Sequence, residues 1–437
     1  MNNVSVPHIT QSAADYFRLV SASLPGDSKV LELRTNAMER FMAKGFPLKS
    51  DEEYKYSGTE KILKDEILWT PEIAPERVID FDSIRNLHKD ALHVFLVNGE
   101  LIEHASDLHD KQNKIICCNL KIAAQNHAEV FNKYYGKNVV GFDDAFAQLN
   151  LAMACNGLLI YVPEGLLIEK PIQINHIGYA NNQSFYQQHH LIIADKRASV
   201  NIIQNYISND QSGAYYNNQV NEIFIADNAQ VNYYQLQNEN NQVVHINATQ
   251  VLQEQNSYFD TNTITIGSAW LRNNLNIKLN GLHCETHLNG LQILSGQQHV
   301  DNHTLVDHQM PHCNSNQLYK GILKDRSTGV FNGKIFVRRD AQKTNAYQSS
   351  KNMLMSDDAT MNTKPQLEIY ADDVKCSHGS STGQIDKNAL FYLRSRALSE
   401  DKARTLLLHA FAIEVIEKIN IASYRSYIEN IIEQRFE

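Results

Sequence analysis

The sequence predicts a mainly β protein in which a long central β-solenoid is flanked by helical segments at both ends. Between about residues 140 and 370, apolar residues come in short runs or strict alternation, as in "NEIFIAD", "TNTITI" and "LNIKLNGL". Such period-two pieces, broken by Asn, Gly and Asp, are typical of strands joined by tight turns. No proline lies between Pro171 and Pro311, which suits strands whose backbone N–H groups are nearly all paired with a neighbour.

Faint internal repeats favour a solenoid over a two-sheet sandwich. "ADKRASVNIIQ" begins at Ala194 and "ADNAQVNYYQ" at Ala226, and "LNGL" occurs at 279–282 and again at 288–291. Strands that bury one face on each rung and carry Asn and Gln on the other are what stacked rungs require. No helical pattern alternates with these strands, so a βαβ sheet is disfavoured. A β-sandwich remains the alternative.

The chain before about residue 110 carries mostly helical patterning. In "SKVLELRTNAMERFMAKGFP", apolar residues recur at i+3 and i+4 spacing from Val30 to Phe41. Gly45 and then Pro47 supply the signals that end a helix. We therefore expect a helical N-terminal domain at 1–135.

Helical patterning returns after the β-rich zone, with Asp386 and Ser399 as N-cap residues. The segment "ARTLLLHAFAIEVIEKI" is apolar on most of its circumference, whereas a helix with one buried face carries a narrower stripe. Either this helix is buried in a bundle of its own, or it offers a second face to a partner protein. The predicted division is thus a β core at 136–370 and a helical C-terminal domain at 371–437.

Composition limits the function classes. The chain has 40 Lys and Arg against 49 Asp and Glu, a net charge of −9, and no block of basic residues. We therefore expect no nucleic-acid partner and no anionic membrane surface. No run approaches the ~18 apolar residues of a membrane helix. Six cysteines in 437 residues are too sparse for a disulfide framework, so we expect reduced thiols and a cytoplasmic protein.

Two histidine-rich stretches resemble metal motifs only superficially. In "LHCETHL", His283 and His287 fall on a predicted strand, where residues four apart lie about 13 Å from each other. They cannot share a zinc ion, which needs ligands within about 2.3 Å. In "HTLVDHQMPHC", a turn at Pro311 could gather Asp307, His308, His312 and Cys313 around a metal, although hydrogen-bonded polar residues on a sheet are the commoner explanation.

Nucleotide-binding loops are absent from the sequence. No G-x-x-x-x-G-K-[ST] string occurs, and no G-x-G-x-x-G follows a strand and opens a helix. If the chain takes part in an ATP-driven process, a different subunit has to supply the ATPase.

The stretch "ADDVKCSHGSSTGQID" places Cys376 and His378 two residues apart. On an extended strand both side chains would point to the same face, about 6.6 Å apart at their Cα atoms. Thiolate and imidazole could then hold a soft metal together with ligands from a second chain, or the imidazole could activate the thiol as a nucleophile. The plainer alternative is a turn in which Cys376 is a small buried residue.

Two long stretches carry a family resemblance. "EIYADDVKCSHGSSTGQIDKNALFYLRSRAL" at 368–398 resembles the signature of the SufB/SufD family of iron–sulfur cluster assembly proteins, and 303–356 resembles that family's core. The stretch "ERFMAKGFPLKSDEEYKYS" at 39–57 and the "CSHG…GQID…LFYLRSR" version of the motif resemble the SufD-type branch. Two departures touch that branch's features: Tyr54 replaces a usual Trp, and Ala397 replaces a frequent Gly.

The resemblance implies a right-handed parallel β-helix core flanked by helical N-terminal and C-terminal domains. It also implies a heterodimer with SufB formed through the cores, and binding of the ATPase SufC by the C-terminal helices. The chain itself would be no enzyme and would hold no cofactor stably, whereas the complex would carry a transient Fe–S cluster. In isolation the chain could form a homodimer.

The resemblance also implies site residues. His378 would be a metal ligand in cluster formation at the SufB interface, with Cys376 as its neighbour in the same motif. Candidate SufC-docking residues are Leu390, Phe391, Leu407 and Phe411. Two alternatives remain: a SufB-type scaffold subunit, and a β-helix carbohydrate-active enzyme. The enzyme would need clustered carboxylates on one face, where this core offers Asn and Gln.

Overall fold

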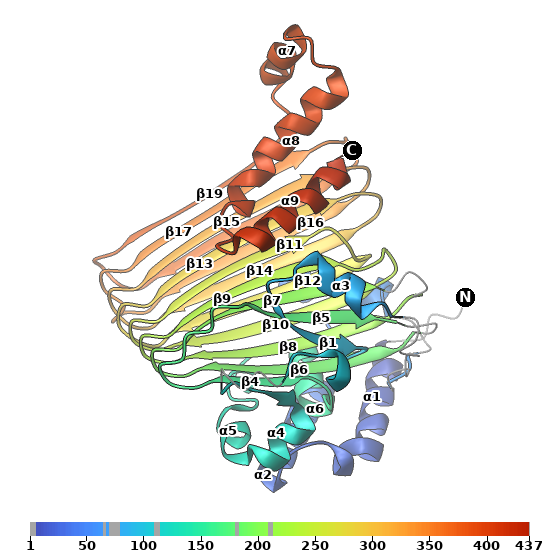
Figure 1. Ribbon diagram of the computed structural model, residues 1–437, viewed down its shortest axis with the longest axis vertical. Coiled ribbons are helices and arrows are strands. Elements are labelled where there is room, and N and C mark those ends of the chain that lie inside the picture. The colour runs from blue at the N-terminus through green and yellow to red at the C-terminus, as the bar shows by residue number, and fades with distance from the viewer. Residues whose placement is uncertain are drawn as a thin grey trace.

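The computed structural model describes residues 6–63, 67–69, 79–108, 114–179, 183–208 and 213–436. Within these ranges the chain forms a two-sided solenoid whose strands alternate between two sheets (Figure 1). The prediction of a mainly β protein with a parallel β-helix core and helical ends is confirmed. A sandwich is excluded, because each strand from β5 to β17 pairs in parallel with the strands one coil before and one coil after it.

The two sheets run the length of the solenoid and contain ten and nine strands in the described residues. Sheet 1 consists of β1 (Leu92–Val97), β2 (Glu100–Leu101), β5 (Ile172–Gly178), β7 (Ser199–Ser208), β9 (Gln230–Asn238), β11 (Tyr258–Thr265), β13 (Glu285–Leu294), β15 (Asn314–Leu323), β17 (Asn345–Leu354) and β19 (Lys375–Gly383). Sheet 2 consists of β3 (Ile116–Asn119), β4 (Leu158–Val162), β6 (Phe185–Ala194), β8 (Tyr216–Ile225), β10 (Val244–Gln253), β12 (Trp270–Leu279), β14 (His299–His308), β16 (Thr328–Val337) and β18 (Thr360–Ile369).

The sharp corner from sheet 2 to sheet 1 is built the same way on successive coils. One residue at each corner has a positive φ, and its backbone N–H donates to a carbonyl of the next coil, as His312 does to Gln342 at 2.9 Å. Left-handed backbone turns the chain in the fewest residues, and Asn tolerates this conformation better than most side chains. We call this column the corner ladder. Its members are Arg197, Asn228, Asn256, His283, His312 and Lys343.

The lumen of the solenoid is divided lengthwise into an apolar half and a polar half. Next to the corner ladder, the inward side chains are aliphatic or aromatic, for example Ile202, Ile223 and Phe259. Away from that corner they are polar and bridge the two sheets; Gln237 donates to Asn273 at 2.8 Å. Buried members of the polar half are His176, His190, Gln204, Gln219, Asn221, Gln235, His245, Asn247, Thr263, Asn273, Asn302, Thr304, Gln317 and Gln348.

The sequence pattern placed Asn and Gln on the outer face of the rungs, and for these residues that expectation is wrong. In-register stacking offsets the cost of burying these polar side chains, because each amide has a hydrogen-bond partner on a neighbouring rung or on the facing sheet. Asn221, for instance, donates to Asn247 at 2.8 Å.

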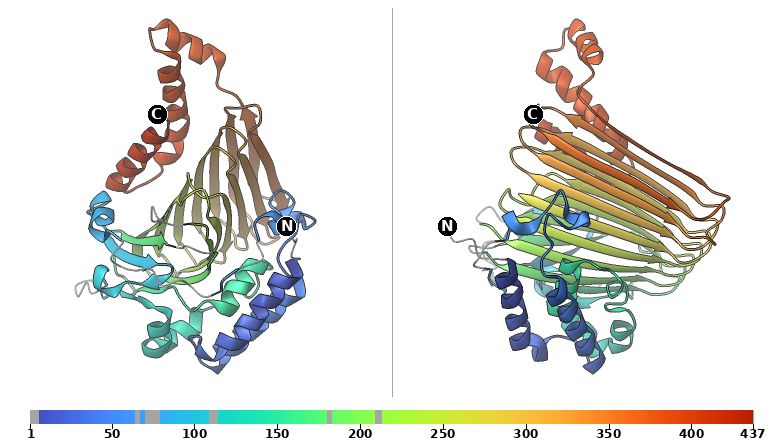
Figure 2. Two further views of the ribbon diagram at one scale, coloured as in Figure 1. Left: turned by 90° about the vertical axis from the view of Figure 1, so that its right-hand side faces the viewer. Right: turned by 180° about the vertical axis from the view of Figure 1, so that it is seen from behind.

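The N-terminal helices are α1 (Val6–Val20), α2 (Ser28–Lys44), α3 (Phe81–Leu87), α4 (Leu120–Asn126), α5 (Ala128–Tyr134) and α6 (Ala145–Met153). The helices other than α3 cover the end of the solenoid where the first coils begin, whereas α3 lies beside the sheets toward α9 (Ala422–Phe436) (Figures 1 and 2). The expectation of a mostly helical first zone missed three strands. Of these, β1 and β2 belong to sheet 1, and β3 belongs to sheet 2. The run "LHVFLV" of β1 is almost wholly apolar and buried, so its periodicity does not tell strand from helix.

A buried polar cluster fixes the N-terminal region to the outer face of sheet 2. Arg272 on β12 pairs with Asp301 at 2.7 Å, and its guanidinium lies 3.7 Å from the ring centroid of Tyr54. Tyr54 in turn donates to Asp144, the N-cap of α6, at 2.6 Å. Tyr54, one of the two family departures, therefore joins the β-helix to α6.

The C-terminal helices are α7 (Lys387–Ser395), α8 (Glu400–Ile416) and α9 (Ala422–Phe436). The predicted N-caps are confirmed: Asp386 accepts from Asn388 N at 2.8 Å and Ser399 from Lys402 N at 3.3 Å. The expectation of a separate helical bundle is wrong, because α8 and α9 pack their apolar residues together on the outer face of sheet 1, and the alternative of a face offered to a partner stays a prediction. None of the helices in the described ranges is long and apolar enough to cross a membrane.

The predicted domain boundaries at 135/136 and 370/371 stay a prediction. The two sheets continue across both positions, since β1 and β3 precede the first and β19 follows the second.

Candidate functional site

Cys376 and His378 lie on β19, the last strand of sheet 1, at the open end of the lumen. Their register partners on β17 are Ala346 and Gln348, both of which are buried and face inward. In-register parallel strands point the same positions to the same side, so Cys376 and His378 also face the lumen. The expectation that an extended segment would put both side chains on one face is confirmed.

The surroundings of Cys376 are apolar. Its side chain is half-buried against a cluster that includes Ile335, Ala346 and Val374. This burial raises the pKa of the Cys376 thiol above its usual range. A nucleophilic or metal-bound sulfur needs the opposite shift, toward the thiolate. The isolated chain therefore favours neither an activated Cys–His pair nor a thiolate ligand at this position.

His378 lies on the polar side of the same opening. Its side chain is exposed, and two residues further along β19 Ser380 donates to Thr363 of β18 at 3.0 Å, across the mouth of the lumen. The lengthwise division of the lumen thus passes between the two motif residues. It keeps the sulfur in apolar contact and the imidazole in reach of solvent or a partner.

A short amide ladder ends directly below His378. Thr304 and Gln348 both donate to Oε1 of Gln317, at 2.7 and 3.3 Å. The buried Oε1 of Gln348 has no hydrogen-bond partner among the described residues. The residue in register with Gln348 on the next rung is His378. A Cβ on Gly333 would lie 2.1 Å from Nε2 of Gln348, so glycine at that position makes room for the amide.

Sequence reasoning missed Thr304, Gln317 and Gln348, because nothing in their local pattern distinguishes them from other polar residues of the β zone. The register of β17 with β19 is the signal that identifies them. It could have been found by aligning the two rungs on their alternating small and polar residues.

No three His, Cys, Asp or Glu side chains of the described chain are grouped so as to hold a metal ion. Cys376 and His378 are two potential ligands, fewer than the four of a closed tetrahedral site. An iron–sulfur cluster that formed here would need further ligands from another chain.

The structure separates the groups of the second histidine-rich stretch. Asp307 pairs with Arg338 at 2.9 Å, and His308 lies 2.9 Å from the hydroxyl of Ser315. Cys313 is buried in the lumen. Asp307 and His308 are thus the hydrogen-bonded sheet residues of the plainer interpretation, whereas His312 lies exposed in the corner turn.

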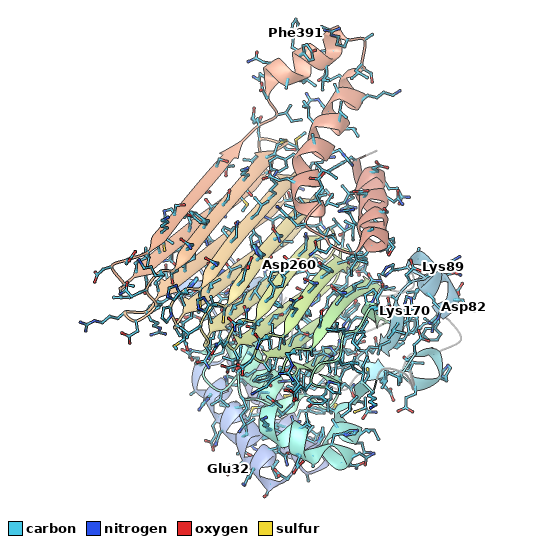
Figure 3. The ribbon with its side chains drawn as sticks, turned by 60° about the vertical axis from the view of Figure 1, so that its left-hand side comes forward. Glu32, Asp82, Lys89, Lys170, Asp260 and Phe391 are labelled. Atoms are coloured by element: carbon cyan, nitrogen blue, oxygen red, sulfur yellow. The ribbon has the colours of Figure 1, made fainter. Side chains whose placement is uncertain are left out.

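The four candidate docking residues differ in exposure. Phe391 on α7 is 74% exposed and lies near the tip of the projecting helix (Figure 3), whereas Leu390 is half-buried. Leu407 and Phe411 on α8 pack against the apolar cluster over sheet 1. Phe411 is held further by Lys320, whose Nζ lies 4.4 Å from its ring centroid and donates to its carbonyl at 2.8 Å.

Two exposed apolar residues near Phe391 were not among the candidates. Tyr392 on α7 and Leu406 on α8 are 58% and 49% exposed. Together with Phe391 they form what we call the α7–α8 apolar patch. Helical spacing alone could not find it, because it does not tell which apolar face of α8 meets the sheet.

The last coil also leaves strand edges open. Within the described chain, β18 and β19 are the terminal strands of their sheets and pair only on one side. Ile369 and Tyr370, at the end of β18, are exposed. Open edges with exposed apolar residues are sites where another chain can add its own strands.

Two family models together match most of the chain. The model described as "SufBD protein N-terminal region" matches residues 9–174. The model described as "SUF system FeS cluster assembly, SufBD core domain" matches residues 176–411, a range that includes Cys376, His378 and Phe391.

Curated relatives are similar over most of their length. The chain is 29% identical to an iron–sulfur cluster assembly SufBD family protein of Synechocystis over 420 residues, 94% of this chain and 92% of the relative. It is 30% identical to the iron–sulfur cluster assembly protein SufD of Escherichia coli over 412 residues, 91% of each. It is 26% identical to SufD of Bacillus subtilis over 329 residues, 74% of this chain and 75% of the relative.

Proposed function

The chain belongs to the SufBD family of SUF-system iron–sulfur cluster assembly proteins, and from that membership we propose that it is the SufD-type subunit of a cluster assembly scaffold. In this role it pairs with SufB, binds the ATPase SufC, and contributes His378 to the coordination of a nascent cluster. The cluster is cargo that is built at the contact between two chains.

The observation that carries the proposal is the position of His378. An exposed imidazole stands at the open mouth of the lumen, on the last rung, with a buried amide acceptor below it. An acceptor that takes one ring N–H leaves the other ring nitrogen unprotonated and free to bind iron. Cys376 is the weaker candidate, because its thiol lies in an apolar cluster that disfavours the thiolate.

Pairing with SufB would use the same end of the solenoid. The open edges of β18 and β19 can accept strands of a second β-helix, and this contact would bring the partner's ligands to His378. One site would then be completed by two subunits, which fits the shortage of ligands on this chain.

Binding of SufC would use the α7–α8 apolar patch. Helix α7, which carries Phe391 and Tyr392, projects beyond the last coil, away from the N-terminal helices (Figure 2). The other end of α8 is anchored to the core: Lys320 pairs with Glu414 at 2.5 Å, and Asn262 donates to the carbonyl of Val415 at 2.7 Å. A movement imposed on α7 by an ATPase would therefore pull on sheet 1, whose last strand carries His378.

In this proposal the chain carries out no turnover of its own, holds no cofactor stably by itself, and works in the cytoplasm. ATP hydrolysis belongs to SufC. A homodimer of the isolated chain, formed through the same open edges, would be the state that SufB displaces.

The SufB-type alternative differs in its partner. A SufD-type chain co-purifies with a distinct SufB, whereas a SufB-type chain completes the cluster site with a copy of itself. The relatives named SufD favour the first.

The test is anaerobic cluster reconstitution on the complex of this chain with SufB and SufC. We expect His378→Ala to abolish most cluster formation while the complex still assembles. The matched control is His287→Ala, a half-exposed histidine on the outer face of the same sheet. If His378→Ala builds clusters at the parent's rate and yield, the ligand role is wrong.

A further inference from the structure

Two histidines stack on each other on the outside of the corner ladder. His283 and His312 occupy the same position on consecutive coils, and their ring centroids are 5.0 Å apart with the planes inclined by 24°. Both side chains are exposed. The dipeptide His-Cys occurs at both corners, with each cysteine turned into the lumen and each histidine turned out.

Neither ring makes a hydrogen bond or an ion pair with the described residues. Most other histidine rings of the described chain are engaged: His287 lies 2.7 Å from Glu285, and His303 lies 3.0 Å from Asp301. Other engaged rings are those of His88, His93, His176, His189, His190, His245, His299 and His308.

The backbone holds the pair rigidly. Both residues have a left-handed conformation, with φ of 58° and 62°, and the N–H of His312 is bonded to the next coil at 2.9 Å. On the preceding coil, Asn256 donates its amide nitrogen to Asn228 at 3.2 Å, so its amide oxygen remains available next to His283. On the following coil, the charge of Lys343 is taken up by Asp373.

The spacing suits a shared metal ion. A zinc-like ion binds imidazole nitrogens at about 2.0–2.1 Å, which puts two ligand nitrogens roughly 3–3.5 Å apart. Equivalent atoms on adjacent strands start about 4.8 Å apart, so small rotations of the exposed side chains close the difference. Imidazole selects zinc, copper, nickel or iron over magnesium and calcium.

We propose that His283 and His312 bind one borderline divalent transition-metal ion on the outer corner of the solenoid, with the oxygen of Asn256 and water completing its coordination. This site is separate from the mouth of the lumen, and the proposal does not rest on the proposed function. Cys284 and Cys313 take no part, because their side chains are buried on the other side of the backbone.

The experiment uses the full chain, free of any affinity tag and stripped of metal. We expect calorimetric titration with Ni(II) at pH 7.5 to resolve a site that His283→Asn and His312→Asn each weaken at least about tenfold, since each removes one of two nitrogen ligands. The control His287→Asn, on the neighbouring strand, should bind like the parent.

A spectroscopic readout separates this site from the other histidines. With one equivalent of Cu(II), the electron paramagnetic resonance spectrum of the parent should carry coupling to two nitrogens, and each variant should lose one. Unfolding temperatures measured in EDTA should be equal for parent and variants, because both side chains are exposed. If the titration and the nitrogen coupling of both variants match those of the parent, the assignment is overturned.

Discussion

Gln348 lies one rung below His378 on the lumen side of sheet 1, and its amide oxygen is buried without a partner in the described chain. Its amide nitrogen donates to Gln317, and the oxygen is the atom of this amide that has no partner among the described residues. If His378 is the ligand proposed above, Gln348 would be a positioning residue for the imidazole on the next rung.

Replacing the acceptor should therefore impair cluster formation without unfolding the chain. We expect Gln348→Leu to slow reconstitution on the complex with SufB and SufC by about tenfold or more, as for other partners that orient a metal ligand. Nitrogen chemical shifts of His378 in the isolated chain should report a changed tautomer population. Gln292→Leu, a polar lumen residue two rungs below Gln348, is the control and should leave both readouts unchanged. Equal tautomer populations in Gln348→Leu and the parent would contradict the role.

The packing around the same amide predicts a stability effect. A methyl group on Gly333 would lie 2.1 Å from Nε2 of Gln348 and 2.7 Å from the ring of Phe331. We expect Gly333→Ala to lower the free energy of unfolding by about 1–3 kcal/mol, measured by urea denaturation. Gly383→Ala is the control, because nothing lies within 4 Å of its added carbon. An equal midpoint for the two variants would show that the lumen has spare room at this rung.

The environment of Asp260 predicts that the free energy of unfolding depends on pH. It lies on the outer face of sheet 1 close to α8 (Figure 3), and its carboxylate accepts only long bonds, from Tyr234 at 3.3 Å and Asn289 at 3.4 Å. Burial raises the pKa of Asp260 from 3.8 to about 6. The folded chain thus holds this proton more tightly than the unfolded chain does, and the free energy of unfolding falls as pH rises from about 4 through 6.

Removing the carboxylate isolates that contribution. We expect the stability of Asp260→Asn relative to the parent to increase between pH 4 and 7, by about 3 kcal/mol at most. Urea denaturation of both proteins at each pH measures the difference, and other titrating groups cancel in it. A difference that stays constant over this interval would mean that Asp260 ionises in the folded chain as readily as in the unfolded chain.

The Arg272–Asp301 pair predicts a large loss of stability. Both side chains are almost fully buried, so Arg272→Leu deprives Asp301 of the guanidinium paired with it and removes the cation–π contact with Tyr54. We expect a loss of about 3–5 kcal/mol and faster proteolysis between the N-terminal helices and the β-helix. Arg18→Leu breaks an exposed pair with Asp15 and should cost less than about 1 kcal/mol. If both variants lost a similar amount of stability, burial would not be what makes the Arg272–Asp301 pair important.

The α7–α8 apolar patch predicts a binding defect. We expect Phe391→Ala to reduce co-purification of SufC while leaving the unfolding temperature of the isolated chain unchanged, because the ring is largely exposed. Leu19→Ala, which changes an even more exposed residue on α1, should retain SufC. Full retention of SufC by Phe391→Ala would move the docking site elsewhere on the helices.

Much of this architecture could be predicted from the sequence, because strand periodicity and helix caps are local signals. Asp386 and Ser399 marked their helices correctly, and the tight turns between strands were recognisable. The direction of Asn221 could not be predicted, since its strand, β8, is buried on both faces and shows no contrast between its two sides. The packing of α8 was missed for a related reason: its partner is a sheet surface formed by residues far away in the sequence.

The candidate site was predicted only in part. Cys376 and His378 are close in sequence, and an extended segment dictates that they share a face. Their different surroundings depend on Ile335 and Gln348, which reach them only through the register of the coils. The amide ladder is therefore a property of the stacked fold and has no signature in the motif itself.

The in-register stacking of the coils gives the molecule a modular length. Each coil advances the solenoid by about 4.8 Å and repeats the same corner, so a whole coil could be deleted or duplicated without turning any side chain to the wrong side. A single inserted residue has no such freedom and would have to bulge out at a corner. The number of coils thus determines the distance between the N-terminal helices and the open end of the lumen, where His378 lies.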